Sequence, residues 1–148
     1  MSNTSCFVFD LDGTLCNVSH RLQWLSCYPK NWDAWNAGIP FDVPNTPVLD
    51  TLKALSVTHS IILVSGRNEQ QRQVTEAWLD KYDVPYTDLY MRDAEDFRAD
   101  DIVKSELADE VEYHHGCIKG VFDDRPSVVQ MWRKRGVECV FDVGGWGA

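Results

Sequence analysis

Two aspartates separated by one residue are the part of this chain best suited to chemistry. Asp10 and Asp12 follow the apolar residues 6–9, and Gly13 and Thr14 come next. An apolar run rich in aromatic and β-branched residues predicts a strand buried on both faces, and open α/β sheets bind ligands beyond the C-terminal ends of such strands. Carboxylates this close repel each other unless a cation neutralises them or one takes up a proton. The segment therefore offers ligands for a hard metal ion, with a nucleophile beside an acid–base group.

Two plainer interpretations of this segment exist. Asp and Gly are common turn residues, so the segment could be only a turn. It also resembles the start of a calcium-binding EF-hand loop, but position twelve of that loop would be Arg21 instead of the required glutamate. The rest of the chain has to decide between a turn and a catalytic site.

Length and composition favour a single domain. We expect residues 1–148 to form one domain, because 148 residues can bury about two-thirds of their unfolded surface. No stretch approaches the roughly 20 apolar residues of a membrane span, and the N-terminus does not look like an export signal. The five cysteines show no CxxC pairing. These features predict a cytoplasmic protein with reduced thiols and no membrane contact.

The net charge of −9 argues against a broad nucleic-acid-binding surface, because such binding depends on neutralising phosphates. It does not exclude a small basic pocket or a bound metal ion that reverses the local potential.

Strand-like and helix-like patterns alternate along the chain. Besides residues 6–9, apolar runs predict buried strands at 61–64 and 118–122, with shorter candidates at 86–91 and 138–141. Apolar residues recur at helical spacing over 74–82, 103–111 and 128–132, and Pro126 suits the first residue of the last helix. The alternation predicts an α/β fold in which a parallel sheet is flanked by helices. We expect residues 144–148 to play no part in a site.

Residues 16–47 interrupt this alternation. The segment is too long and too aromatic for a plain loop, so we expect a small helical insert that forms a cap or lid over the C-terminal edge of the sheet. Ser19 could cap a short helix within it. Its aromatic residues either pack the cap onto the sheet or provide a stacking platform for a nucleobase. They are Trp24, Tyr28, Trp32, Trp35 and Phe41.

Polar clusters follow each of the three main strands, and the C-terminal ends of parallel strands share one edge of a sheet. Alone, the cluster after residues 61–64 could cap a helix, and Lys104 could lie on a solvated helix face. Together they suggest a Mg²⁺ site with cations and a hydroxyl that hold a phosphoryl group. The residues concerned are Asp10, Asp12, Ser65, Gly66, Arg67, Asp100, Lys104, Asp123 and Asp124.

At these residues the chain resembles the haloacid-dehalogenase-like (HAD) phosphohydrolases. Asp10-x-Asp12-Gly13-Thr14, Ser65, Lys104 and Asp123-Asp124 match the four family motifs in order. A closer resemblance, to the 3′-phosphatase domains of phage polynucleotide kinase/phosphatases, is carried by residues 65–67, 100–106, 123–133 and 136–139. It implies a HAD-like Rossmannoid fold.

The resemblance also implies roles for these residues. Asp10 would be the nucleophile that becomes an aspartyl-phosphate, and Asp12 the general acid–base. Asp12 must then be protonated at the first step, which repulsion from the neighbouring carboxylate would favour. Mg²⁺ would be held by Asp10, the backbone carbonyl of Asp12, Asp123 and Asp124. Thr14, Ser65, Gly66, Arg67 and Lys104 would bind the substrate phosphate, and Asp100 would position Lys104 or Arg67.

The function predicted in this way is a Mg²⁺-dependent phosphomonoesterase that removes 3′-phosphate from DNA or RNA ends. The alternatives are a small-molecule phosphatase such as a 5′-nucleotidase, and a phosphate-end-binding protein without turnover. The chain has no Gly-x-x-x-x-Gly-Lys-Ser/Thr loop, so we expect any kinase or ligase activity to reside in a separate partner. Substrates would be phosphorylated nucleic-acid ends or nucleotides, and the sequence leaves the oligomeric state open.

Overall fold

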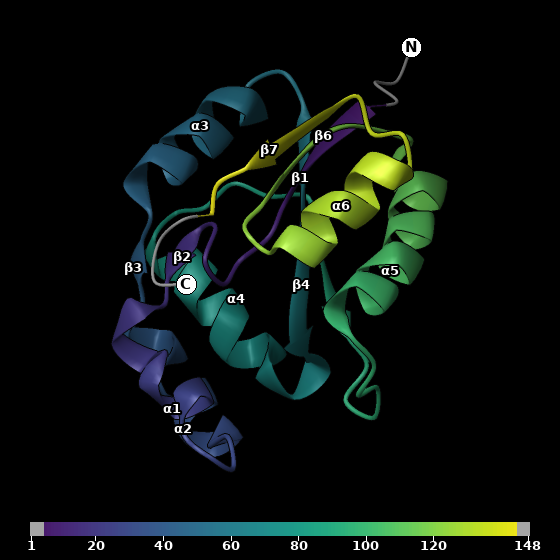
Figure 1. Cartoon of the computed structure of the whole chain (residues 1–148). Helices are drawn as coiled ribbons and strands as arrows, with labels where there is room; N and C mark the ends of the chain where they lie inside the picture. The colour runs from purple at the N-terminus through teal and green to yellow at the C-terminus, as the bar shows by residue number, and fades with distance from the viewer. Residues whose placement is uncertain (1–4, 145–148) are drawn as a thin grey trace.

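A five-stranded sheet organises the chain (Figure 1). The computed structural model describes residues 5–144. The strand order is β5-β4-β1-β6-β7 and every neighbouring pair is parallel. The strands are β1 Ser5–Phe9, β4 Ser60–Asn68, β5 Asp88–Arg92, β6 Cys117–Asp123 and β7 Cys139–Asp142. The α/β fold with a mainly parallel sheet, predicted from the alternating pattern, is confirmed.

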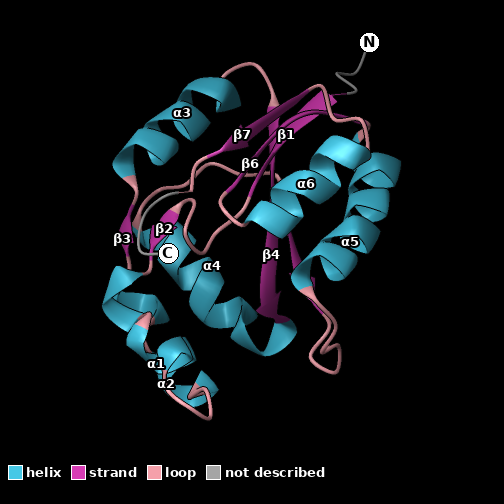
Figure 2. Ribbon diagram, viewed as in Figure 1, coloured by secondary structure: helices cyan, strands magenta, loops and turns pink. Residues whose placement is uncertain are grey.

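Helices cover both faces of this sheet (Figure 2). On one face, α3 (Thr46–Ser56) and α4 (Arg72–Lys81) bury Leu52, Trp78 and Leu79 against the strands. On the other face, α5 (Asp100–His115) and α6 (Pro126–Lys134) bury Val111 and Trp132. Because both faces are covered, the inner strands are apolar along almost their whole length, as is typical of parallel sheets.

The insert between β1 and α3 contains more strand than predicted. It begins and ends with a short antiparallel pair, β2 (Cys16–Asn17) and β3 (Val43–Pro44). Between these strands lie two 3₁₀ turns, η1 (Ser19–Arg21) and η2 (Ile39–Phe41), and two short helices, α1 (Gln23–Ser26) and α2 (Trp32–Ala37). The two helices extend from the side of the molecule below β2 and β3 (Figure 1). The strand pair closes the insert at its base, so its two ends enter and leave the core side by side.

Several local predictions needed correction. The two shorter strands lie at 88–92 and 139–142, one or two residues later than expected, and helix α3 has no counterpart among the predicted helices. Pro126 does begin α6. Ser19 is not a helix cap, because its hydroxyl donates to Asn17 Oδ1 at 2.8 Å and it lies inside η1.

Among residues 5–144, none of the helices is long and apolar enough to span a lipid bilayer. Of the C-terminal segment expected to play no part in a site, residues 145–148 lie outside the described residues.

Candidate active site

Three carboxylates meet where β1 and β6 end. Asp10 directly follows β1, Asp123 is the last residue of β6, and Asp124 comes next. Their nearest carboxylate oxygens lie within 4.8 Å of one another. The rings of Phe9 and Phe122, one residue before Asp10 and Asp123, stack with centroids 4.3 Å apart. The paired strands and stacked rings therefore fix the two aspartates side by side.

Gly13 allows the third carboxylate to approach. Its φ is +83°, a conformation that favours glycine, and a Cβ at this position would collide with the carboxylate of Asp124. The hydroxyl of Thr14 lies 3.1 Å from an oxygen of Asp10 and 3.1 Å from an oxygen of Asp124. The Gly-Thr pair that follows the aspartates is thus part of the same cluster.

Lys104 lies inside this cluster, not on a solvated helix face. It comes from the first turns of α5, is buried, and its Nζ donates to Asp10 Oδ1 at 2.7 Å and to Asp123 Oδ2 at 2.9 Å. Burial alone would lower the pKa of Lys104, but Asp10 and Asp123 raise it above its usual value. Lys104 therefore stays charged, and the three carboxylates outnumber it.

Burial and repulsion act on the carboxylates themselves. Burial, followed by the charge of Asp123, raises the pKa of Asp10 well above its usual value, and Lys104 opposes this shift. Burial also raises the pKa of Asp124. Both shifts mean that ionising the whole cluster is costly without a further cation. Three closely spaced hard oxygen ligands with excess negative charge fit a divalent cation such as Mg²⁺.

Asp12 does not share this environment. Its Oδ1 accepts hydrogen bonds from Arg67 Nη2 at 2.5 Å and from Arg21 Nη2 at 2.8 Å. Burial would raise the pKa of Asp12, but Arg67 and then Arg21 outweigh it and lower the pKa to about 2. The prediction that repulsion from Asp10 keeps Asp12 protonated is therefore wrong for the free protein. The two aspartates of the motif have opposite electrostatic surroundings.

A buried carboxylate of the insert, Asp42, shares Arg21 with Asp12. It lies between η2 and β3, is fully buried, and accepts from Arg21 through Nε at 2.8 Å and Nη2 at 2.7 Å. Its Oδ1 also lies 2.6 Å from His20 Nε2. The guanidinium of Arg21 stacks over Trp35 of α2, 4.0 Å from the ring centroid. Arg21 thus links the insert to the acid–base candidate.

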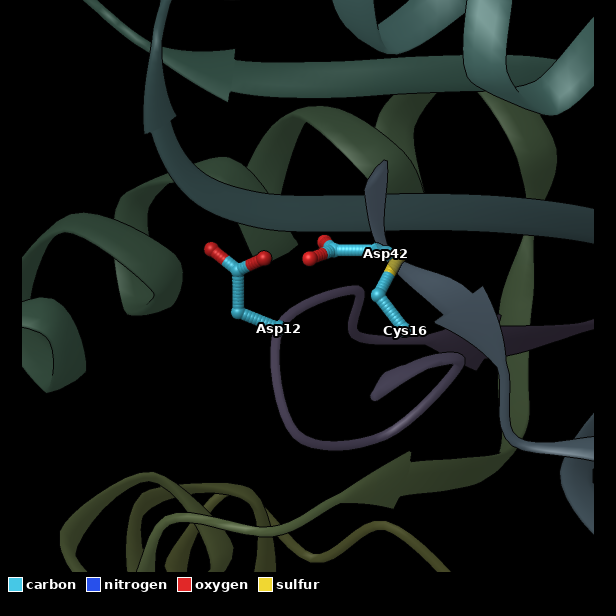
Figure 3. Close-up of side chains that lie close together, drawn as sticks. All are labelled: Asp12, Cys16 and Asp42. Atoms are coloured by element: carbon cyan, nitrogen blue, oxygen red, sulfur yellow. The ribbon is translucent and has the colours of Figure 1, made fainter. Parts of the chain in front are cut away.

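Figure 3 shows Asp12, Cys16 and Asp42, with the carboxylate of Asp42 pointing toward that of Asp12. The nearest ligand atoms of the three residues lie within 4.8 Å of one another, a spacing that could suit a metal ion. The guanidinium groups of Arg21 and Arg67 already contact this group and supply two positive charges. Two guanidinium groups therefore match the two carboxylates of this group, whereas in the Asp10 cluster Lys104 contacts a set of three carboxylates.

Ser65 and Arg67, near the C-terminal end of β4, have different partners from those expected. Ser65 is buried and its hydroxyl accepts from the backbone N–H of Arg67 at 3.0 Å. Arg67 donates to Asp12 and, through Nη1, to Thr75 Oγ1 at 3.0 Å. In the free protein Arg67 is therefore bound to the acid–base candidate, where a phosphate contact was expected.

Asp100 contacts neither of its two predicted partners by hydrogen bond. Its Oδ1 accepts from Arg92 Nη2 at 2.6 Å and its Oδ2 from Arg125 Nη1 at 3.1 Å. A Cβ on Gly66 would collide with the Asp100 carboxylate, so this glycine permits Asp100 to pack against the end of β4. Asp100 thus supports the rim of the site.

Sequence reasoning missed Asp42 entirely and did not identify a carboxylate partner for Arg21. A buried carboxylate in an aromatic insert has no periodic pattern that identifies it. The segment also contains His20, Lys30 and Asp33, so no signal in the sequence singles out Asp42 as the partner of Arg21.

Comparison with known proteins agrees with the geometry. Residues 4–144 match the family described as the polynucleotide kinase PNKP phosphatase domain. A putative bifunctional polynucleotide kinase/RNA ligase of Autographa californica nuclear polyhedrosis virus is 32% identical over 137 residues, which are 90% of this chain and 18% of that protein.

Solved structures give the same picture. A chain in the structure of the Pnkp1/Rnl/Hen1 complex matches with a TM-score of 0.81 and 35% identity over 95% of this chain and 45% of that one. A class C acid phosphatase from Bacillus anthracis, at 17% identity, shares the fold with a TM-score of 0.71 over 100% of this chain and 69% of its own. The chain spans less than half the length of the viral protein and of the chain in the complex. The motifs, the fold and these matches agree: the chain is a HAD-like phosphatase that belongs to the family of polynucleotide kinase PNKP phosphatase domains.

Proposed function

We propose that this chain is a Mg²⁺-dependent phosphomonoesterase that removes the 3′-phosphate from ends of DNA or RNA through an aspartyl-phosphate. The observation that carries the proposal is the separation of the two motif aspartates. Asp10 lies in the carboxylate cluster beside Lys104, whereas Asp12 is bound by arginines. This arrangement supports Asp10, beside the cation Lys104, as the nucleophile and Asp12 as the residue that transfers a proton.

The carboxylate cluster would hold the metal ion. Asp10, Asp123 and Asp124, with the backbone carbonyl of Asp12, are the proposed ligands. Bound Mg²⁺ would offset the negative charge that Asp10 and a phosphate group bring together. Lys104, with the hydroxyls of Ser65 and Thr14 and the backbone N–H of Gly66, would bind the oxygens of the phosphate.

The reaction would then proceed in two steps. An oxygen of Asp10 attacks phosphorus in line with the bond to the 3′-oxygen, and Asp12 gives its proton to that oxygen as the alcohol departs. Asp12, now ionised, takes a proton from a water molecule, which attacks the aspartyl-phosphate and regenerates Asp10. Phosphate is released and both carboxylates return to their starting states.

The low pKa of Asp12 in the free protein suggests how substrate prepares this acid. Arg67 and Arg21 keep Asp12 ionised, and within residues 5–144 the other carboxylate that their guanidinium groups contact is Asp42. A phosphate dianion that takes hydrogen bonds from Arg67 would weaken its contact with Asp12 and add a negative charge nearby. Both effects raise the pKa of Asp12, so substrate binding favours its protonation.

The names of the relatives support the choice of substrate and partner. The viral relative is called a polynucleotide kinase/RNA ligase, and another relative is found in a complex called Pnkp1/Rnl/Hen1. We infer that this phosphatase likewise acts on nucleic-acid ends in the cytoplasm, alongside a kinase or ligase carried elsewhere.

A substrate panel tests the proposal. The chain is assayed with a 3′-phosphorylated oligonucleotide, the same oligonucleotide carrying a 5′-phosphate, and nucleoside monophosphates, each with Mg²⁺ and with a chelator. We expect Mg²⁺-dependent release of phosphate, fastest from the 3′-phosphorylated oligonucleotide. Faster hydrolysis of nucleoside 5′-monophosphates would replace this proposal with a nucleotidase, and no turnover on any substrate would leave a phosphate-binding protein.

A further inference from the structure

Arg125 differs from the other cations at the edge of the sheet where the active site lies. Lys104, Arg67 and Arg21 are buried, and each donates to a carboxylate inside the protein. The side chain of Arg125 is 57% exposed, although it directly follows Asp123 and Asp124. Among the cations of the site described above, it is therefore the one that presents its guanidinium to solvent.

The position of Arg125 is fixed at both its backbone and its side chain. Its backbone N–H donates to Asp123 Oδ1 at 3.2 Å, which places the residue next to the carboxylate cluster. Its Nη1 donates to Asp100 Oδ2 at 3.1 Å. The guanidinium therefore has a defined direction at the rim, unlike a freely moving surface arginine.

Asp100 is itself held firmly by a second arginine. Arg92 Nη2 donates to its other oxygen at 2.6 Å, and Arg92 Nε donates to the carbonyl of Gly66 at 2.9 Å. Arg92 Nη1 also donates to the carbonyls of Asp96 and Arg98. One carboxylate thus orients an exposed arginine through a chain of contacts that leads back to β4.

This arrangement leaves an anion site outside the catalytic cluster. A guanidinium has five N–H donors, and among the described residues Asp100 accepts from Nη1 of Arg125. The remaining donors can bind a second anion beside the scissile phosphate. A nucleoside monophosphate has no second phosphate, whereas an oligonucleotide has a phosphodiester one nucleotide away.

We propose that Arg125 binds the phosphodiester that precedes the terminal nucleotide, and so favours polynucleotide ends over mononucleotides. This inference rests on the proposed function, because it assumes a 3′-phosphorylated oligonucleotide in the site. Such a contact would also explain how a chain of net charge −9 can bind the end of an anionic polynucleotide as its substrate. One oriented cation beside the active site is enough for this, and a broad basic surface is not needed.

The test compares Arg125→Gln with the unmodified protein on three substrates: a short 3′-phosphorylated oligonucleotide, a nucleoside 3′-monophosphate and 4-nitrophenyl phosphate. Glutamine keeps an N–H donor for Asp100 but removes the charge. We expect kcat/KM for the oligonucleotide to fall roughly three- to tenfold, mainly through KM, since an exposed charged contact is modest. We expect less than twofold change for the two substrates without a phosphodiester.

The salt dependence of kcat/KM provides a second, independent measurement. The slope of log(kcat/KM) for the oligonucleotide against log[salt] should become shallower by about 0.7 in Arg125→Gln, as one phosphate contact to a single strand is lost. Arg125→Lys should retain that slope. Arg133→Ala, on the exposed face of the last turn of α6, is the matched control and should leave slope and KM unchanged.

Two results would overturn the assignment of Arg125. These are equal losses on all three substrates, or an oligonucleotide kcat/KM within twofold of the unmodified protein. Failure of the proposed function would be visible separately, in the unmodified protein itself, as slower hydrolysis of the 3′-phosphorylated oligonucleotide than of the nucleoside monophosphates. In that case the assignment of Arg125 fails with it.

Discussion

Removing either member of the Arg21–Asp42 pair should destabilise the fold strongly, and removing both should cost less than the sum of the two single losses. The side chains of Arg21 and Asp42 are 1% and 0% exposed and share two hydrogen bonds. Without Arg21, the two carboxylates Asp12 and Asp42 have only Arg67 as a nearby arginine. Without the charge of Asp42, the guanidinium groups of Arg21 and Arg67 have Asp12 as their one carboxylate partner among the described residues. Either variant leaves the carboxylates and guanidinium groups of this network unequal in number, and removing one partner of a buried ion pair typically costs about 3–5 kcal/mol of unfolding free energy.

The double variant restores the balance of charge. In Arg21→Met/Asp42→Asn, Arg67 and Asp12 remain as a matched pair, with three hydrogen bonds recorded between them. We therefore expect the double variant to be more stable than the sum of the two single losses by about 2 kcal/mol, within the range measured for residues in direct contact.

Urea denaturation followed by tryptophan fluorescence measures these free energies, with an unchanged slope as the check that each variant unfolds in the same way. Asp109→Asn is the control, because it breaks an ion pair with Arg135 in which Asp109 is exposed, and it should change the midpoint little. Single variants within about 1 kcal/mol of the unmodified protein, or a double variant equal to the sum of the singles, would refute the view that these two buried charges stabilise each other.

Other consequences follow from the two carboxylate environments. In the folded protein the pKa of Asp10 is raised, so the contribution of Asp10 to the stability of the metal-free protein is full at low pH and is lost as pH rises through that pKa. The increase in melting temperature with Mg²⁺ should therefore grow as pH rises, and it should shrink in Asp123→Asn. In the folded protein the pKa of Asp12 is lowered from 3.8 to about 2. Ionised Asp12 therefore contributes roughly 2 kcal/mol of unfolding free energy above its unfolded-state pKa, and this contribution is lost as pH falls through the folded-state pKa. During acid titration followed by circular dichroism, Asp12→Asn should lose less stability across this pH range than the unmodified protein. Asp12→Asn should also slow hydrolysis of a 3′-phosphorylated oligonucleotide more than that of 4-nitrophenyl phosphate, whose leaving group needs no proton; equal losses would argue against a general acid.

The sequence predicted best what depends on short patterns. Buried parallel strands are apolar throughout and end abruptly in polar residues, so the strand ends and the meeting of Asp10 with Asp123 could be predicted before the structure. The family resemblance came from the same residues. Pro126 identified the start of α6 because proline suits the first helical position.

What the sequence did not predict depends on contacts between distant residues. Arg21 and Asp42 lie 21 positions apart in an insert without periodic pattern, and only the fold brings them together. The sequence likewise identified Arg67 as a site residue but could not show that it binds Asp12 in the free protein, because that contact spans 55 positions. Packing in the folded protein determines which carboxylate each arginine contacts, and the spacing of residues in the sequence does not reveal it.

The proposed reaction requires Asp10 to form a covalent phosphoryl intermediate during turnover of 3′-phosphate ends. The most direct measurement is rapid acid quenching of the protein during reaction with a 3′-phosphorylated oligonucleotide and Mg²⁺, followed by mass spectrometry of its peptides. We predict one phosphoryl group on the peptide that contains Asp10, absent in Asp10→Asn and absent when a chelator replaces Mg²⁺. Turnover of the oligonucleotide with no phosphorylated protein at any quench time, or with the phosphoryl group on another residue, would contradict the account.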